Sequence, residues 1–452
     1  MTGIPLLIAF VLAIILMIVA ISRFKVHAFL ALMGISLLFA IIAGIKLTDI
    51  PGIIGQGFSG TFTSIGIVII LGALVGTLLE KTGAALKMAD VVVKLVGKKH
   101  PELAMLIMGW IVSIPVFCDS GFVILNPIRK ALVKRTGRSS VASTVALSMG
   151  LYISHCFIPP TPGPIAAANT LYEGLGQPVN LLLVMGIGAA CSLLPLIASY
   201  VFALVIGKSV KAKDDVDSGE VVQTYEELVA SYGKLPSALM SFAPIVVPII
   251  LMGLGSAFKM AGLDLPLFAF LGTPIMALAV GLLIGIAQLA MGGKLQDLYE
   301  LTDSTLRVTG PILFVTAAGG VLGKVIASTD IVNFVSQNSG ALSTLGYFFP
   351  FLIAAILKTA QGSSTVAITT TAGIMAPLLA TIGFTTPVQL ALVVIAIGSG
   401  AMTVSHANDS YFWVVTNFGQ MDVKDGYRTQ TLGTLVVGIA GILNVVLLSL
   451  VL

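Results

Sequence analysis

The chain has 452 residues, of which 57% are hydrophobic and only 10% are charged, and its mean hydropathy is +1.06. A soluble core of this length does not need so much apolar surface, so the composition excludes a soluble protein and indicates repeated membrane crossing. The formal net charge is +4, but in such a chain basic residues mainly report which loops stay in the cytoplasm. Nothing in the composition supports nucleic-acid binding.

Apolar segments of spanning length recur along the whole chain. The ten ordinary candidates are residues 4–22, 28–45, 62–80, 141–158, 179–207, 237–258, 267–292, 310–327, 386–404 and 429–452. Two further segments, 102–133 and 343–380, hold apolar stretches too short to cross twice, each interrupted near its middle by polar, glycine-containing sequence. We interpret both as re-entrant helical hairpins.

Basic residues set the orientation of these segments. With the N-terminus outside and each hairpin returning to the side it entered from, most of the 24 lysines and arginines fall in cytoplasmic loops. This is the bias that membrane proteins follow. If 102–133 crossed the membrane instead, basic loops would lie on both sides of it.

The charged stretch 208–235 is the one long polar connection, and we interpret it as a cytoplasmic linker. On either side of it the same order occurs: three spans, a hairpin, a broken span and a final span. The expected fold is therefore an all-α polytopic membrane protein with two inverted-topology repeats, each containing a re-entrant helical hairpin and a broken transmembrane helix. The first repeat covers 1–207, with hairpin 102–133 and broken helix 141–175; the inverted second repeat covers 236–452, with hairpin 343–380 and broken helix 386–418.

A short sequence echo favours the two repeats. Residues Ser148–His155 read SMGLYISH and residues Ser399–His406 read SGAMTVSH, with both serines and the histidine at a constant offset. Each segment falls in the broken span of its repeat.

Four segments are expected to break helices at membrane depth: Phe117–Gly121, His155–Pro164, Gln361–Thr365 and His406–Ser410. Unpaired backbone in hydrocarbon costs several kcal/mol per group, so such breaks persist only where protein or a water-filled cavity covers them. We therefore expect the four breaks to converge. Half-helix N-termini suit a carboxylate, unwound carbonyls suit a cation or proton, and the hydroxyl and amide side chains suit a substrate with several hydroxyl groups.

Asp119 is the leading candidate for proton coupling, because a carboxylate near the bilayer midplane is expensive and usually functional. It could instead cap the following helix, and the two roles are compatible. Asp409 and His155 are further candidates for proton coupling, and His406 for proton relay or substrate contact. Lys358 could face the substrate carboxylate or extend toward the outer surface.

The candidate substrate site combines residues from all four breaks. Its members are Asp119, Ser120, Gly121, Ser154, His155, Thr161, Pro162, Gly163, Lys358, Gln361, Gly362, Ser363, Ser364, Thr365, Ser405, His406 and Asn408.

Five motifs, in order along nearly the whole chain, resemble the gluconate permease family within the larger ion-transporter superfamily. They are FKVHAFLAL, FCDSGFVIL, FIPPTPGP, QGSSTVAITTTAGIMAPL and VSHANDSYFW. The resemblance implies proton-coupled uptake of an aldonate such as gluconate across the bacterial inner membrane. It also implies hairpins that carry the site, a homodimer and an elevator motion.

The chain departs from the gluconate members of that family at two positions, where they carry glutamate for Asp119 and histidine for Thr161. A smaller hydroxy acid such as glycerate, or D-serine, is therefore the alternative substrate, and sodium remains open as the coupling ion. A membrane-embedded enzyme and an anion channel are the competing functions. The sequence has no HExxH, GxSxG or Walker A motif, so we expect no enzyme, cofactor, metal or direct use of ATP.

Overall fold

The computed structural model describes residues 2–96, 100–212, 235–260, 263, 265–330, 344–406 and 409–452. Every regular element within these ranges is a helix, so the all-α prediction is confirmed. Most of the predicted linker 208–235 lies outside the described residues.

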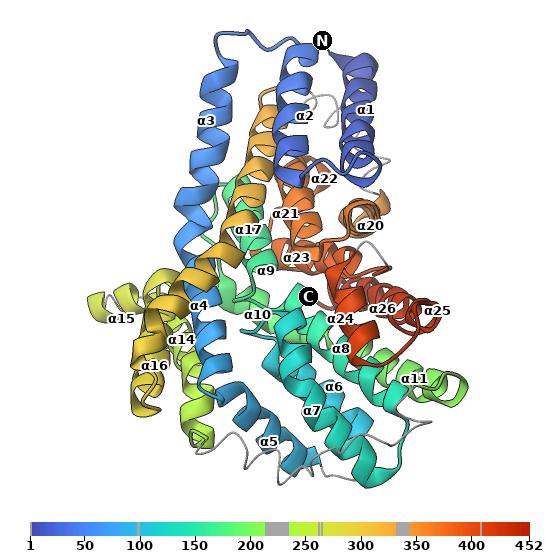
Figure 1. Cartoon of the computed structure of the whole chain (residues 1–452). Coiled ribbons are helices and arrows are strands. Elements are labelled where there is room, and N and C mark those ends of the chain that lie inside the picture. The colour runs from blue at the N-terminus through green and yellow to red at the C-terminus, as the bar shows by residue number, and fades with distance from the viewer. Residues whose placement is uncertain are drawn as a thin grey trace.

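The chain up to residue 96 forms five helices (Figure 1). They are α1 (Gly3–Ser22), α2 (Ala28–Ala43), α3 (Ile50–Thr61), α4 (Ile67–Lys81) and α5 (Ala84–Val96). A π-helical turn, η1 (Phe62–Gly66), joins α3 to α4. The path bends by 71° between α4 and α5, where Gly83 has a φ of +76° that residues with a side chain rarely adopt.

Proline-rich breaks interrupt the next helices. The segment predicted as hairpin 102–133 forms α6 (Pro101–Val112) and α7 (Cys118–Thr136), and the following broken helix forms α8 (Ser140–Phe157) and α9 (Pro162–Gly174). Pro115 stands in the first break, and Pro159 and Pro160 in the second. Proline ends helices because it lacks an N–H and crowds the preceding turn. Helices α10 (Leu181–Cys191) and α11 (Leu193–Ser209) complete the first half.

The second half likewise contains long helices, split helices and a final long helix. Its elements are α14 (Ala238–Met260), α15 (Pro266–Leu271), α16 (Pro274–Met291), η2 (Leu295–Asp297), α17 (Leu298–Ala327), α20 (Phe348–Gln361), α21 (Ser364–Met375), η3 (Ala376–Leu378), α22 (Leu379–Ile382), α23 (Pro387–Ala401), α24 (Ser410–Phe418), α25 (Val423–Gly426), η4 (Tyr427–Thr431) and α26 (Leu432–Ser449).

Some of the observed helices differ in length from the ten expected membrane spans. Among the described residues, eight helices are long and apolar enough to cross a membrane, and the bent pair of α4 and α5 could form a ninth. Helices α2 and α23 occupy expected spans but have only 16 and 15 residues. The span expected at 310–327 is the second half of the 30-residue α17. Hydropathy misses such an extension because its charged residues do not stop a helix.

The first arm of each split pair packs closely on the broken helix that follows, α6 on α8 and α20 on α23. Glycine permits both contacts. A Cβ on Gly150 of α8 would overlap the Leu106 carbonyl oxygen, and a Cβ on Gly400 of α23 would overlap the carbonyl oxygen of Phe351. Small residues at such crossings let helix backbones approach in lipid, where packing drives association.

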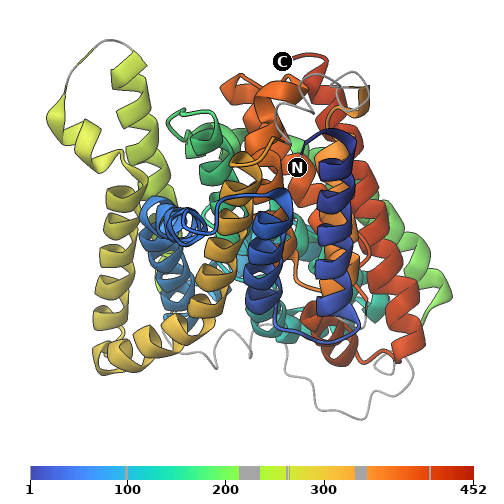
Figure 2. The ribbon, with the colours of Figure 1, turned by 90° about the horizontal axis from the view of Figure 1, so that it is seen from above.

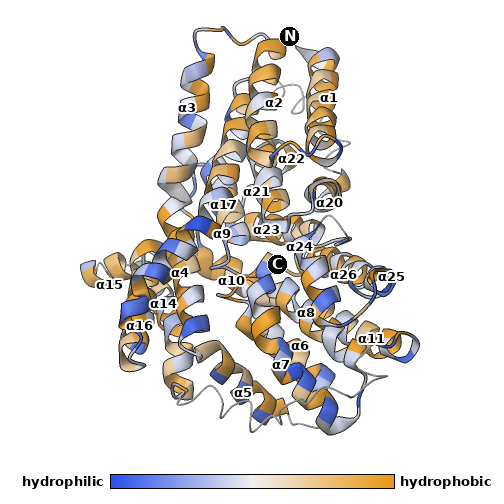
Figure 3. Ribbon diagram, in the orientation of Figure 1, coloured by the Kyte–Doolittle hydropathy of each residue, from blue (hydrophilic) through white to orange (hydrophobic). Residues whose placement is uncertain are grey.

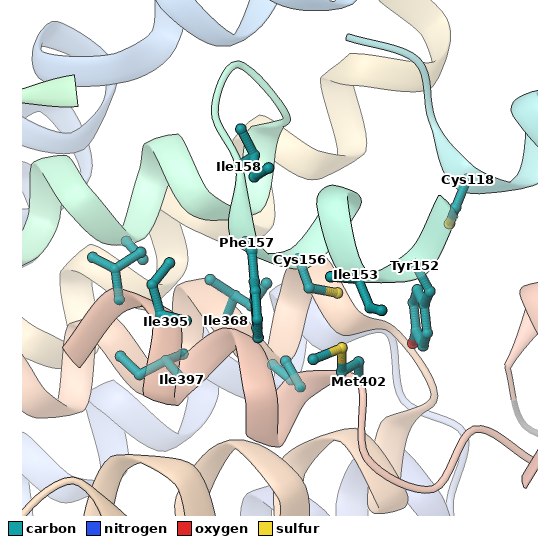
Figure 4. Packing of buried hydrophobic residues seen from close by; sticks show 14 of the residues in the cluster. Cys118, Tyr152, Ile153, Cys156, Phe157, Ile158, Ile368, Ile395, Ile397 and Met402 are labelled. Carbon is teal, nitrogen blue, oxygen red and sulfur yellow. The ribbon is translucent and has the colours of Figure 1, made fainter. Parts of the chain in front are cut away.

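The two broken helices also cross each other. A Cβ on Gly398 of α23 would overlap the carbonyl oxygen of Cys156 in α8. Figure 4 shows the ring of Phe157 pointing from α8 toward α23, beside Ile368 of α21. This crossing joins the two halves of the chain at two largely buried helices.

Each half also covers part of the other. Helix α7 contacts α24, and α21 contacts α9, so the second arm of each split pair lies against the broken helix of the opposite half. Helix α3 of the first half likewise packs along α17 of the second half. We call these contacts between the halves exchanged packing. Seen from above, α14 and α16 lie on one side of this interlocked centre and α11 and α26 on the other (Figure 2).

Apolar side chains face outward along many helices, as lipid contact requires. In α1, for example, Ile4, Ile8 and Leu12 are exposed. Figure 3 shows the prevalence of hydrophobic residues along the helices, with hydrophilic residues toward the lower end of α7, which carries Lys130 and Lys134.

The crossing of α6 and α8 yields a stability prediction. Gly150→Ala would drive a methyl group into the Leu106 carbonyl, and we expect this to cost about 1–3 kcal/mol. The matched control is Gly186→Ala in α10, where nothing lies within 4 Å of the new Cβ and the substitution should be neutral or stabilising by up to about 1 kcal/mol. Thermal unfolding of both purified variants in detergent checks this, and equal midpoints would contradict the role given to Gly150.

Candidate functional site

Three of the four expected helix breaks meet at one cavity of about 670 Å³. The hairpin breaks supply Phe117 to Ser120 and Gly362 to Thr365, and the second broken helix supplies Asp409 to Tyr411. Tyr152 and His155, from the last turns of α8, and His27, at the start of α2, add to the polar part of the lining. The backbone interruptions of the two halves are thus sheltered in a shared pocket, as the cost of unpaired backbone in lipid requires.

Three helices of the broken segments begin at this cavity, as α2 does, so their N-terminal N–H groups gather around it. Helix α7 starts at Cys118, α21 at Ser364 and α24 at Ser410. The hydroxyl of Ser363 accepts a hydrogen bond from the N–H of Val366, 3.3 Å away, and caps α21. Helix N-termini carry partial positive charge and free donors, and they are recurrent sites for carboxylate and phosphate groups.

A buried ion pair joins α20 to the start of α24. The Lys358 ammonium lies 2.6 Å from Oδ2 of Asp409, and the lysine side chain has no exposed surface. The same ammonium donates to the carbonyl oxygen of Gly362. Lys358 therefore does not extend to the outer surface, which was one of its two expected positions.

Asp409 has several other partners besides this lysine. Its Oδ1 accepts a hydrogen bond of 3.1 Å from the N–H of Tyr411, which caps α24. Ser405 donates its hydroxyl hydrogen to Oδ2 of Asp409. The carboxylate is thus compensated in charge and almost fully hydrogen-bonded.

Asp119, which also lines the cavity, is held more loosely. Its nearest side-chain donors are the hydroxyl of Ser410, 3.3 Å from Oδ1, and the thiol of Cys118, 3.6 Å from Oδ2. No described lysine or arginine lies within ion-pair distance of it. It stands in the first turn of α7, where a carboxylate is favoured by the helix dipole.

Two polar atoms at the cavity wall lack a protein partner among the described residues. The hydroxyl of Tyr152 and Nδ1 of His155 are both buried, and neither makes a hydrogen bond of ordinary length and angle there, although the Ser364 side chain lies close to the Tyr152 hydroxyl. Buried polar groups are rarely left unsatisfied, so these atoms are available to a ligand or water. The sequence pointed to His155 and not to Tyr152, although their i, i+3 spacing puts both on one helical face.

The first broken helix contributes less to the cavity than expected. The Thr161 hydroxyl donates to the carbonyl oxygens of His155 and Ile158, so it caps the end of α8. Gly163 lies against Ile368 of α21, and neither it nor Pro162 lines the cavity. Ser154 donates back to the carbonyl of Gly150 within α8.

The second break brings in Ser405 and His406. A ring nitrogen of His406, Nε2, lies 3.0 Å from the carbonyl oxygen of Thr359, near the end of α20. Val404, just before Ser405, has a φ of +59°, which costs a β-branched residue of order 1–3 kcal/mol. Two contacts hold this backbone: the N–H of Ser405 donates to Thr434, and its carbonyl accepts from Thr431.

The sequence echo does not correspond to equivalent positions. Ser154 and His155 lie inside α8, whereas Ser405 and His406 lie beyond the end of α23.

Two further groups of predicted site residues lie elsewhere. Gly121 lies in the first turn of α7, with Leu151 2.7 Å from where its Cβ would be. Asn408 lies outside the described residues, as does the side chain of Gln361.

A second cavity of about 350 Å³ adjoins the first and shares Phe117, Ser120 and Val308 with it. The Thr305 hydroxyl donates to that of Thr77 across its wall, at 2.9 Å. Glu80 also lines this space. Within the described ranges, no group of three or more His, Cys, Asp or Glu residues is arranged to hold a metal ion.

Comparison with known proteins gives a consistent assignment. Residues 4–451 match the family described as GntP family permease. An uncharacterized permease of Haemophilus influenzae is 33% identical, over 100% of this chain and 94% of that protein. A gluconate permease of Pseudomonas aeruginosa is 28% identical, over 96% of both chains.

A solved structure shares the fold. Neisseria gonorrhoeae MtrF, described as illuminating a class of antimetabolite efflux pumps, superposes with a TM-score of 0.70 over 95% of this chain and 96% of its own. The sequence identity is 14%, so this likeness concerns the fold alone.

The two carboxylates should respond differently to neutralisation. Asp409→Asn leaves the buried ammonium of Lys358 unpaired, and we expect a loss of about 3–5 kcal/mol of stability. Asp119→Asn breaks no ion pair within the described part of the chain, and its side-chain donors lie at 3.3 and 3.6 Å, so we expect a change within about 1 kcal/mol. Thermal unfolding of the two variants in the same detergent provides the comparison. A greater loss at Asp119 would contradict the charge arrangement described here.

Proposed function

The chain belongs to the GntP family of permeases, and we propose that it is a secondary active symporter that takes up a sugar acid, such as gluconate, together with protons. It is a multi-span transporter of the bacterial inner membrane and not an enzyme. The observation that carries the proposal is the cavity between the split helices, with its three helix N-termini and its unequal carboxylates.

The cavity has the chemistry of a site for a hydroxylated anion. A substrate carboxylate would be favoured by the N-termini of α7, α21 and α24, as anions are elsewhere. Hydroxyl groups would find Ser120, Ser364 and Thr365 in the lining, together with the unpartnered atoms of Tyr152 and His155. These groups donate and accept, as a polyol requires.

The charge balance favours coupling to protons at Asp119. Lys358 compensates Asp409, which leaves the carboxylate of Asp119 facing a cavity that would also hold an anion. Two like charges in such a site repel strongly, because the surrounding dielectric is low. A proton on Asp119 removes this repulsion. Binding of proton and substrate therefore support each other, which is the requirement for symport.

The exchanged packing of the halves supports an elevator motion. The contacts of α7 with α24 and of α21 with α9 bind both split pairs into one unit, and the Lys358–Asp409 pair adds an ionic tie. We propose that this unit moves as a body against the remaining helices and that two inverted repeats, 1–207 and 236–452, generate its two end states. We further propose that the protein works as a homodimer, as the family resemblance implies.

The coupling role of Asp119 can be tested by substituting asparagine for it. In proteoliposomes with an inward proton gradient, Asp119→Asn should lose gradient-driven accumulation of gluconate, because the coupling proton has no site. Binding of the substrate to the purified variant should persist. Undiminished uptake with the wild-type pH dependence would refute the role. If the wild type moves gluconate only down its concentration gradient and never accumulates it, the result would favour a channel instead.

Substrate identity can be tested by ligand-induced stabilisation, because a ligand that binds only the folded state raises the melting point. We expect aldonates such as gluconate to stabilise the purified protein more than glycerate or D-serine. Tyr152→Phe should weaken the binding of the best ligand by about 3–10-fold, as expected for one lost hydrogen bond.

Tyr172→Phe is the matched control for this substitution. Its hydroxyl donates to the Pro387 carbonyl, 2.6 Å away, and Tyr172 does not line the cavity. The variant should lose some stability and keep its affinity. Equal affinity loss in both variants would show that Tyr152 acts through the fold and does not contact the ligand.

A further inference from the structure

The ammonium of Lys358 occupies a cluster of oxygen atoms at the end of α20. It donates to the Gly362 carbonyl oxygen and lies 2.6 Å from Oδ2 of Asp409. The hydroxyl of Ser405 donates to the same carboxylate oxygen. No part of the lysine side chain is exposed, and the residue is absent from the cavity lining.

The same oxygen atoms would suit a free monovalent cation. Carbonyl, carboxylate and hydroxyl oxygens are the ligands that hard cations prefer. The end of a helix adds partial negative charge from its last carbonyl groups. In membrane transporters, unwound carbonyls and half-helix C-termini are where coupling cations bind. Here Gly362, with a φ of +88°, ends α20 and turns its carbonyl oxygen to the ammonium.

We propose that Lys358 is a tethered cation that takes the place of a coupling sodium ion at the second split pair. Transport then needs no sodium. The part of this proposal that concerns transport rests on the proposed symport function. The part that concerns cation binding does not, because it can be measured on the purified protein without any substrate.

The position of Lys358 favours this role over direct contact with the substrate. Its charge is already matched by Asp409 at close range, so little remains for a second anion. Tyr152, which does line the cavity, has its ring centroid 5.7 Å from the ammonium. At the corresponding break of the first half, the hydroxyl of Ser113 donates to the carbonyl oxygen of Val116, 2.8 Å away, so a neutral group takes this position there.

Removing the tether should create a sodium site. Lys358→Ala empties the ammonium position and leaves Asp409 unpaired, so sodium ions should bind there. We expect the melting point of this variant to rise by roughly 2 °C or more when ~100 mM choline chloride is replaced by ~100 mM sodium chloride. The wild type should not respond. Lys324→Ala, which removes an exposed lysine from the last turn of α17, is the control for a general effect of lost charge and should not respond either.

Each outcome decides the proposal. A sodium response in the wild type, or none in folded Lys358→Ala, overturns it. If Lys358→Ala does not fold in either salt, the double variant Lys358→Ala/Asp409→Asn decides, because it removes the unpaired carboxylate as well. The proposal requires that the double variant fold and not respond to sodium. Its failure to fold would overturn the proposal, since Lys358 would then contribute something other than charge.

Uptake by the wild type separates this proposal from the function on which it partly rests. Replacing all external sodium by choline at constant pH should leave gluconate uptake within ~2-fold of its value in sodium. A larger loss overturns the sodium-independent mechanism. Absence of gluconate uptake in either salt would instead contradict the proposed substrate, and the melting-point response of Lys358→Ala would still test the cation site.

Discussion

Every carbonyl and amide group inside the hydrocarbon layer must find a partner within the protein, and the placement of polar side chains in this chain follows from that requirement. At several helix breaks, a side chain caps the exposed end. Thr161 caps α8, Lys358 and the ring of His406 meet the end of α20, and the amide of Asn444 donates to the carbonyls of Ala190 and Cys191 between α10 and α11. Several of these residues look like substrate ligands in the sequence alone, because capping and binding use the same groups.

The charges of the site are divided unequally between the two halves. The first half supplies Asp119, which has weak protein partners, and the second supplies Lys358 and Asp409, which neutralise each other. Of these two carboxylates, only that of Asp119 is therefore free of a cationic partner among the described residues and able to exchange a proton with the solvent or interact with the substrate. A buried ion pair need not add stability, and here it fixes the end of α20 against the start of α24, beside the cavity.

The sequence predicted the breaks well, because proline, glycine and polar residues seldom cluster within an apolar stretch unless a helix ends there. It predicted the convergence of three breaks from the cost of unpaired backbone in lipid. It did not predict the pairing of Lys358 with Asp409, since 51 positions separate them and nothing local joins them. Tyr152 was missed because a tyrosine in an apolar helix resembles packing, and Thr161 was assigned to the site because its inward hydrogen bonds are invisible in sequence. Span lengths were less predictable, since α17 continues through charged residues.

The exchanged packing of α7 on α24 and α21 on α9 has a consequence for how the protein is made. When the ribosome has delivered the first 207 residues to the membrane, the polar start of α7 has no α24 to cover it, because residues 410–418 are among the last to be synthesised. This segment therefore stays without its cover from α24 until the C-terminal part arrives. Truncation near the C-terminus would therefore leave the first half without its cover, and a bacterial quality-control protease acting on unassembled membrane segments would encounter the chain at that stage.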